Sequence, residues 1–328
     1  MNEKVQKALK YVLSFALAGV LVYFAFRKVD WAEFWESLKC TNWWYITLSV
    51  VVSLLALHFR QLRWIMMLQP LDDKVKQIDV WDADNIGNLA NIVLPGAGEF
   101  TRCGLMSSPR AKYDKVFGTI LMERIWDFVA IIALLAIALI LMWDRLGSFF
   151  IETIVKPTAG RFTFGLGWAL ISLVAVIALL IWLIFKFRKK VKAFDKIAEL
   201  LQGMAQGFVA SLKIKKKFLF FLYTVLIWLM YVLTTLFTFK AMPELADLGF
   251  GDSLFLSAIG NFASVIPVPG GIGAYHYLVT ITLTSLYDTT WELGILFATL
   301  SHEIHALILI VTGVISYVCW QIRKKKKI

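Results

Sequence analysis

The chain has 328 residues, of which 59% are hydrophobic and 15% aromatic, with a formal net charge of +11 and a mean hydropathy of +0.71. This composition excludes an ordinary soluble domain and predicts an all-α polytopic membrane protein. The positive charges collect at the ends of apolar runs, which favours an anionic membrane surface over nucleic acid as their partner. Three cysteines, Cys40, Cys103 and Cys319, show neither a disulfide framework nor the ligand spacing of a zinc site.

Six apolar segments predict helices that span a bilayer core of about 30 Å. They are residues 9–26, 43–68, 116–143, 162–187, 218–239 and 293–320. The first is interpreted as a retained helix and not as a signal peptide, because it is long and lacks a small-x-small cleavage site. Residues 188–217 are rich in basic side chains, and the apolar and charged spacing within them predicts an amphipathic cytoplasmic linker helix.

Residues 87–99 and 260–273 match each other, and in both copies a polar stripe that begins a few residues earlier runs into a Pro-Gly corner. The stripe residues have helical spacing and are Asn85, Asn88 and Asn91 in the first copy, and Ser257, Asn261 and Ser264 in the second. Arms of about ten to fourteen residues are too short to cross the bilayer, so each copy predicts a re-entrant helical hairpin, at about 84–107 and 252–286. Broken backbone at membrane depth requires protein or a wet cavity around it, which makes the two corners a candidate binding site.

The basic residues also predict the topology. Most of the 34 lysines and arginines fall on the cytoplasmic side if both termini are cytoplasmic and neither hairpin crosses the membrane. The two hairpins then enter from opposite sides, in halves of about 43–143 and 218–320 within a single integral membrane domain, residues 1–328. An inverted-topology repeat of this kind is typical of alternating-access transporters.

Four motifs follow one another along the chain. They are Arg60-x-x-Arg63-Trp64, Asn91-x-x-Leu94-Pro95-Gly96-x-Gly98-Glu99-x-x-Arg102, Glu123-Arg124-x-x-Asp127 and Ile266-Pro267-x-Pro269-Gly270-Gly271-Ile272-Gly273. This ordered set resembles the flippase-like transmembrane region of lysylphosphatidylglycerol synthase (multiple peptide resistance factor), in its stand-alone form.

The resemblance implies a multi-pass protein of the bacterial or archaeal plasma (inner) membrane that moves phospholipids or lipid-linked precursors between leaflets. The aminoacyl-transferase domain of the synthase is absent from the sequence, so we expect this chain not to be an enzyme by itself. The family usually has a Glu after the second glycine motif, where this chain has His276, so a role for that carboxylate does not carry over.

The arginines at the apolar boundary are candidates for headgroup contact, because an Arg inside a membrane costs roughly 2.5–3.5 kcal/mol and needs a partner or a task. For Arg60 and Arg63 the alternative is a pair of cytoplasmic anchors that snorkel to the interface. For Arg102, an ion pair with Glu99, three residues away, is as good an interpretation as contact with phosphate.

Two carboxylates follow on the next spanning segment. Glu123 and Asp127 are four residues apart and therefore share a helix face, which predicts a proton or cation site. The alternative is a buried network in which they satisfy Arg124 and Arg102.

The corresponding segment of the second half has Glu303 in the place of Arg124, flanked by His302 and His305. These residues predict either a titratable relay or packing inside the bundle. Only two residues separate the histidines, unlike the HExxH motif of metalloproteases, so we predict no metal site and no other cofactor.

The glycines of the two corners, Gly96 and Gly98 in the first and Gly270, Gly271 and Gly273 in the second, predict sharp turns. The half-helices that begin there point backbone N–H groups toward the bilayer interior, and such ends suit phosphate. Close helix packing is the alternative role of these glycines. The residues predicted to contact the headgroup are Arg60, Arg63, Asn88, Asn91, Gly96, Gly98, Glu99, Arg102, Arg124, Asn261, Pro269, Gly270, Gly271, Gly273 and His276.

These observations predict a lipid flippase or scramblase whose partners are membrane phospholipids, with anionic headgroups favoured. One alternative is a small-solute or ion transporter of the same architecture. Another is an accessory membrane subunit for a soluble lipid-modifying partner.

Overall fold

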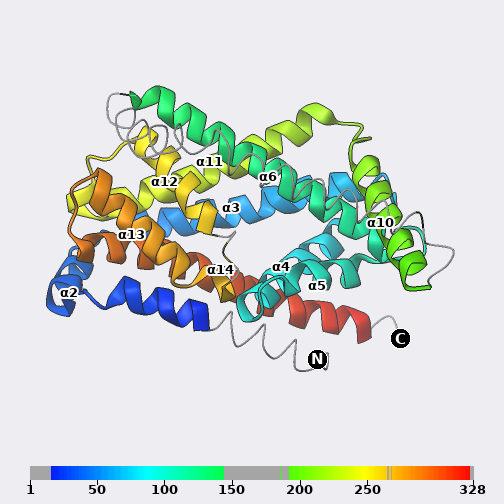
Figure 1. The fold of residues 1–328 in the computed structure, drawn as a ribbon, viewed down its shortest axis with the longest axis horizontal. Helices are drawn as coiled ribbons and strands as arrows, with labels where there is room; N and C mark the ends of the chain where they lie inside the picture. Colours follow the sequence, from blue (N-terminus) through cyan, green and yellow to red (C-terminus); the bar gives the residue numbers. More distant parts are fainter. Residues whose placement is uncertain (1–15, 144–185, 187–191, 264–265, 267, 326–328) are drawn as a thin grey trace.

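The computed structural model describes residues 16–143, 186, 192–263, 266 and 268–325, and all regular secondary structure among them is helical (Figure 1). Among these residues, four helices are long and apolar enough to cross a membrane. They are α3 (Trp43–Leu68), α6 (Tyr113–Leu141), α11 (Lys217–Ala241) and α14 (Trp291–Lys325). A shorter apolar helix, Ala16–Phe26, is the described part of the first predicted span, whereas the span predicted at 162–187 lies almost wholly outside the described residues. The all-α membrane class is confirmed.

A broken pair of helices lies in each half of the chain. The first pair is α4 (Gln77–Val93) and α5 (Ala97–Met106), and the second is α12 (Phe250–Phe262) and α13 (Ala274–Leu286), with the 3₁₀ turn η4 (Pro269–Gly271) between its arms. The first arm is longer than predicted because α4 begins at Gln77, and Asp82 and Asp84 lie buried inside the bundle and not in a loop.

The two pairs occupy opposite ends of the bundle formed by the long helices (Figure 1). One apolar cluster surrounds the first pair, where α3 ends and α6 begins, and includes Trp64, Val80 and Ile120. Another surrounds the second pair, where α11 ends and α14 begins, and includes Phe239 and Phe297, whose ring centroids are 4.9 Å apart. Each hairpin therefore has its own hydrophobic support.

The corners of the two pairs meet between these clusters. A side-chain carbon added at Gly270, in the second corner, would lie 3.9 Å from the Cα atom of Ile92 near the end of α4. The two halves also pack against each other: α14 contacts α4, and α6 contacts α12. The strongest contact between the halves runs along α3 and α11.

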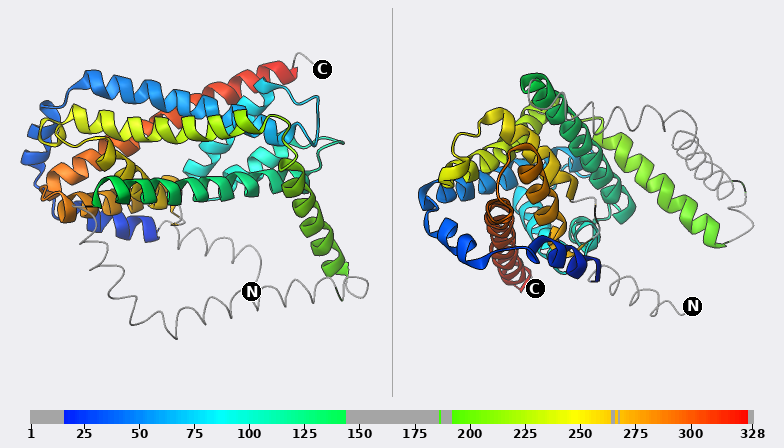
Figure 2. Two further views of the ribbon diagram at one scale, coloured as in Figure 1. Left: turned by 90° about the horizontal axis from the view of Figure 1, so that it is seen from above. Right: turned by 60° about the vertical axis from the view of Figure 1, so that its left-hand side comes forward.

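Two further described helices lie outside the segments 43–143 and 218–320. Helix α10 (Lys192–Ser211) confirms the helix predicted within the linker, and Figure 2 shows it crossing the direction of the long helices. It crosses α6 closely because Gly207 lies against the backbone of Lys115 and Gly118 against that of Met204. Helix α2 (Trp31–Lys39) was missed by the sequence analysis, although Asp30 caps it by accepting a hydrogen bond from the Ala32 N–H (2.8 Å).

Candidate functional site

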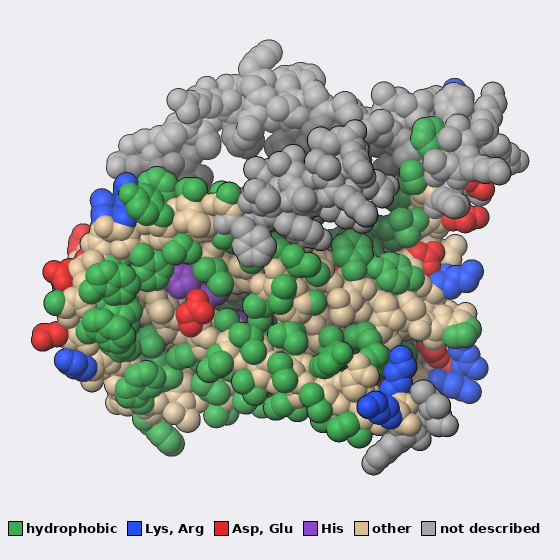
Figure 3. All heavy atoms as spheres, turned by 90° about the horizontal axis from the view of Figure 1, so that it is seen from below, with side chains coloured by type: hydrophobic (Ala, Val, Ile, Leu, Met, Phe, Trp, Pro, Cys, Tyr) green, Lys and Arg blue, Asp and Glu red, His purple; other side chains and the backbone are tan. Residues whose placement is uncertain are grey.

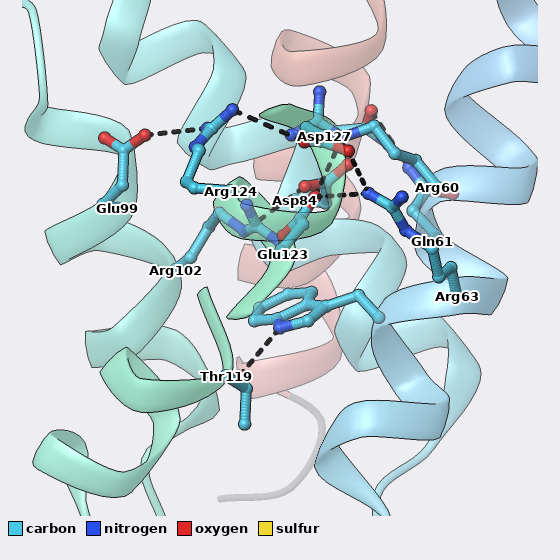
Figure 4. Close-up of polar contacts among 12 residues, drawn as sticks. Arg60, Gln61, Arg63, Asp84, Glu99, Arg102, Thr119, Glu123, Arg124 and Asp127 are labelled. Carbon is cyan, nitrogen blue, oxygen red and sulfur yellow. Dashed lines mark hydrogen bonds and ion pairs between the residues drawn. The ribbon is translucent and has the colours of Figure 1, made fainter. Parts of the chain in front are cut away.

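A network of charged side chains lies between α3, α4, α5 and α6, on the hairpin of the first half (Figure 4). It joins four arginines to four carboxylates, so that its formal charges balance: Arg60, Arg63, Arg102 and Arg124 with Asp84, Glu99, Glu123 and Asp127. Burial of a charge is tolerated only when it is paired, and this network supplies the pairs.

Glu123 is the centre of the network and is fully buried. Its Oε1 accepts from Arg60 Nε at 3.1 Å, and its Oε2 accepts from Arg102 Nη2 at 2.7 Å. One turn further along α6, Asp127 accepts from the buried Arg63 Nη2 at 2.7 Å. Two carboxylates four residues apart on α6 therefore face two arginines three residues apart on α3, so each pair shares one face of its helix.

Arg102 passes from α5 into the middle of the hairpin. Its guanidinium lies 3.9 Å from the ring centroid of Trp64, and its Nε lies 3.3 Å from Asp84 Oδ1. Gly87 leaves room for it, because a side-chain carbon at that position would lie 2.6 Å from Arg102 Cγ. The indole of Trp64 donates to Thr119 Oγ1 at 3.1 Å, which fixes the ring beneath the guanidinium.

The network reaches the apolar surface of α6 at Arg124. This side chain is 47% exposed and donates to Glu99 Oε1 at 2.9 Å. Its neighbours on α6 include the exposed side chains of Leu121, Ile125 and Phe128. The network thus has a buried end at Arg63 and Arg102, and an open end at Arg124.

The structure decides between several interpretations of the sequence. The interpretation of Arg60 and Arg63 as anchors that snorkel to the interface is wrong, because both are paired within the network and Arg63 is fully buried. The proposed ion pair of Arg102 with Glu99 is also wrong, because Arg102 pairs with Asp84 and Glu123. The buried network around Glu123 is confirmed.

Several donors in the network are left without a hydrogen-bond acceptor. Arg60 Nη2, Arg63 Nε and Nη1, and Arg102 Nη1 are buried and have no hydrogen-bond partner among the described residues. Buried polar atoms in native proteins are almost always satisfied. These N–H groups are therefore available to an oxygen ligand or to water.

The first corner is a tight turn of three residues between α4 and α5. Gly96 has a φ of 79° and forms the N-cap of α5, a conformation that favours glycine. The Gly98 N–H donates to Asn91 Oδ1 at 2.7 Å, and a side-chain carbon at Gly98 would overlap the Gly87 carbonyl. The hairpin thus uses one of the helix-end N–H groups predicted to face phosphate.

The second corner is longer and built differently. Gly270, Gly271 and Gly273 all have positive φ, and Pro269 is buried. A side-chain carbon at Gly273 would lie 2.8 Å from the backbone N of Val22, in the helix Ala16–Phe26. Asn261 donates to the Ser257 carbonyl at 2.8 Å, whereas Asn88, its counterpart in the first half, leaves its buried Nδ2 without a partner among the described residues.

A cluster of two imidazoles and one carboxylate adjoins the second corner. His302 Nε2 lies 2.9 Å from the Gly270 carbonyl oxygen, and His302 Nδ1 lies 3.0 Å from Glu303 Oε1. His276, on α13, brings its Nε2 to 3.6 Å from the same carboxylate oxygen. Figure 3 shows histidine side chains and an acidic side chain reaching a face otherwise dominated by hydrophobic side chains. His305 is not part of this cluster.

Sequence reasoning missed three members of these sites. Asp84 was used only as a boundary, although it is buried against Arg102. Trp64 appeared in a motif, but no role was predicted for it, and Thr119 was not considered. A buried aspartate on an otherwise apolar helix face was the one available signal for Asp84.

A model of the family described as lysylphosphatidylglycerol synthase TM region matches residues 11–313 of this chain. A protein named glycosyltransferase AglD, from Haloferax volcanii, is 26% identical over 300 residues, which cover 82% of this chain and 48% of that protein. The chain thus spans about half the length of this curated relative. No solved structure matches it.

Proposed function

Because this chain belongs to the family of the lysylphosphatidylglycerol synthase transmembrane region, we propose that it moves an anionic phospholipid or a lipid-linked precursor between the leaflets of a bacterial or archaeal plasma membrane. The headgroup passes between the corners of the two hairpins while the acyl tails stay in lipid. The chain itself carries no transferase activity, and both of its termini lie in the cytoplasm.

The observation that carries this proposal is the open end of the charged network. Arg124 lies about 16 Å along α6 from Tyr113, at about 1.5 Å per residue, which is near the middle of a bilayer core of about 30 Å. Glu99 pairs with Arg124 on one side, but 47% of the Arg124 side chain stays exposed, and an exposed guanidinium at that depth is costly unless a further anion meets it at the lipid-facing surface. A phosphate headgroup is such an anion and accepts two hydrogen bonds from one guanidinium.

The arrangement of the hairpins supports a path for the headgroup. They approach each other from opposite ends of the bundle and meet at Ile92 and Gly270. We interpret them as an inverted-topology repeat, whose halves rock against each other to open the corners to one leaflet and then to the other. The side-chain networks on the two hairpins then line the two faces of a single path.

Reconstitution tests the proposal directly. Purified protein is placed in vesicles that contain a fluorescent anionic lipid, and a membrane-impermeant reductant then bleaches the label in the outer leaflet. Roughly half of the label is protected in empty vesicles, and we expect active protein to expose the rest. A panel of anionic and lipid-linked substrates that stays protected in the presence of protein contradicts the proposal.

A matched pair of variants links the activity to the network. Arg124→Ala removes the cation at the open end and should slow the anionic lipid by about tenfold or more, the effect of losing one charge-assisted hydrogen bond of roughly 1.5–3 kcal/mol. Arg110→Ala removes an exposed Arg that pairs with Asp73 in a loop and should leave the rate unchanged. If the unmodified protein and both variants move the lipid at equal rates, Arg124 does not take part in transport.

Labelling of single cysteines tests the inverted repeat separately. A cysteine in place of Lys74, before the first hairpin, should react only from the cytoplasm, and one in place of Glu244, before the second, only from outside. The native Cys40, Cys103 and Cys319 are first replaced by Ser. If both positions react from the same side, the two halves do not have inverted topology, and the main structural reason to prefer transport is lost.

One observation favours a second function. The curated relative is named a glycosyltransferase, and this chain matches about half of its length. A membrane module that holds the lipid substrate or product for a separate soluble transferase would also fit that match. Co-purification of such an enzyme, without lipid movement in vesicles, selects this function.

A further inference from the structure

We propose that His276, His302 and Glu303 bind a divalent transition-metal ion, with zinc as the best fit. The three residues come from α13 and α14, and their ligand atoms all lie within 4.8 Å of one another. The site goes beyond the proposed lipid movement, and metal binding can be measured without it.

The spacing of the ligand atoms fits one ion. Zinc binds imidazole nitrogen at about 2.0–2.1 Å, so two ligands at the corners of a tetrahedron are about 3.4 Å apart. Glu303 Oε1 lies 3.0 Å from His302 Nδ1 and 3.6 Å from His276 Nε2. Two histidines and one glutamate are a ligand set that zinc uses with water in the fourth position.

Hydrogen bonding assigns the tautomer of His302. A carbonyl oxygen only accepts, so the His302 Nε2 that faces Gly270 O at 2.9 Å carries the hydrogen. In the neutral ring Nδ1 then keeps its lone pair, which points at a carboxylate oxygen 3.0 Å away. Two acceptors at this distance repel each other unless a proton or a metal ion lies between them. Metal-binding histidines usually donate their other N–H to a carbonyl or carboxylate, as His302 does here.

The surroundings also favour a cation. His276 is buried, whereas Glu303 is 46% exposed, so the cluster is open on the Glu303 side. Glu303 lies about 18 Å along α14 from Trp291, at a depth like that of Arg124 on α6. The first hairpin has a guanidinium at this depth, and a metal ion would give the second hairpin a positive charge where it has no Arg or Lys among the described contacts of the cluster.

The inference departs from the sequence-based prediction of no metal site. That prediction considered His302 and His305, which are neighbours in the sequence. In the structure the second histidine of the cluster is His276 and not His305. His276 lies on another helix, so the local spacing around His302 could not point to it.

Metal titration of the purified protein tests the inference. The protein is prepared with a purification tag free of histidine, stripped with a chelator, and titrated with Zn²⁺ against a fluorescent indicator. We expect one ion per chain. Titration with Co²⁺ should give the visible absorption of a tetrahedral site, which reports on the ligands themselves.

Variants at Glu303 and His276, with a control at His58, complete the test. Glu303→Gln and His276→Gln should each weaken Zn²⁺ binding by about tenfold or more, whereas His58→Gln, on α3 and outside the cluster, should bind as the unmodified protein does. Glu303 is half exposed, so its variant should fold even if the His276 variant does not. The inference is overturned if the unmodified protein binds no Zn²⁺, or if Glu303→Gln binds it equally well. Vesicles that move lipid at the same rate with and without Zn²⁺ leave the proposed function intact in either case.

Discussion

The two hairpins repeat one backbone plan but carry different chemistry. The first turns in three residues and encloses a network of balanced charges around the buried Glu123. The second turns through three glycines with positive φ and presents two histidines and a half-exposed glutamate. Positions that correspond in the repeat differ in sign, since Arg124 pairs with Glu99 in the first half and Glu303 faces His276 in the second. Both hairpins therefore have polar groups near their corners, but the two sets of groups suit different ligands.

The largest expected difference between the halves is in stability. Glu123→Ala leaves Arg60 and Arg102 without their main carboxylate in a buried site, and breaking a buried pair typically costs about 3–5 kcal/mol. His302→Ala, at the aligned position of the second half, removes one hydrogen bond to Gly270 and should cost about 1–2 kcal/mol. The free energy of unfolding in detergent measures both. Equal losses would show that the two clusters support the fold alike.

The next effect concerns close approach within the first hairpin. Gly98→Val should abolish transport, because its side chain overlaps the Gly87 carbonyl and the Asn91 side chain. Gly104→Val is the matched control on the same helix, since nothing lies within 4 Å of a side-chain carbon there. Vesicle transport and membrane insertion are measured together. Full transport by Gly98→Val would mean that the arms can separate without loss of the path.

Gly273→Val tests the same requirement in the second hairpin. It combines a φ of 82°, which costs a residue other than glycine roughly 1–2 kcal/mol, with a contact to the backbone of Val22. The helix Ala16–Phe26 must move to accept the new side chain. We expect insertion to survive and transport to be lost. A smaller loss than for Gly98→Val would place the tighter part of the path in the first half.

Sequence patterns predicted the helices of this fold better than they predicted which charged side chains pair with each other. Helix α3 has the predicted bounds, because apolar length and the cap at Asn42 are local properties. Helix α4 begins earlier than predicted because Asp82 and Asp84 resemble loop residues until Arg323 and Arg102 are seen to neutralise them. Which arginine meets which carboxylate depends on the packing of four helices, and the spacing of Arg102 from Glu99 was misleading for that reason.

The histidine cluster could not be predicted for a similar reason. His276 and His302 lie on different helices, and the length of the second corner decides whether they meet. The sequence showed that a corner exists but not that eleven residues, 263–273, separate α12 from α13.

The smallest expected effect on stability, and the sharpest on selectivity, is at the open end of the network. Arg124→Ala removes an ion pair at the edge of the network and leaves the buried pairs of Glu123 in place, so the protein should fold normally. Transport of an anionic lipid should fall, while a zwitterionic lipid should move at the unmodified rate, because the lost guanidinium recognises net negative charge more than the path itself.

The unpaired Glu99 that this variant leaves behind must be controlled, since its negative charge would repel an anionic headgroup even if Arg124 never touched one. The double variant Arg124→Ala with Glu99→Gln removes that charge. If Arg124 contacts the headgroup, the double variant stays slow for the anionic lipid. If transport returns to the unmodified rate, Arg124 serves only to neutralise Glu99, and the headgroup path must run along the buried donors of Arg63 and Arg102 or through the second hairpin.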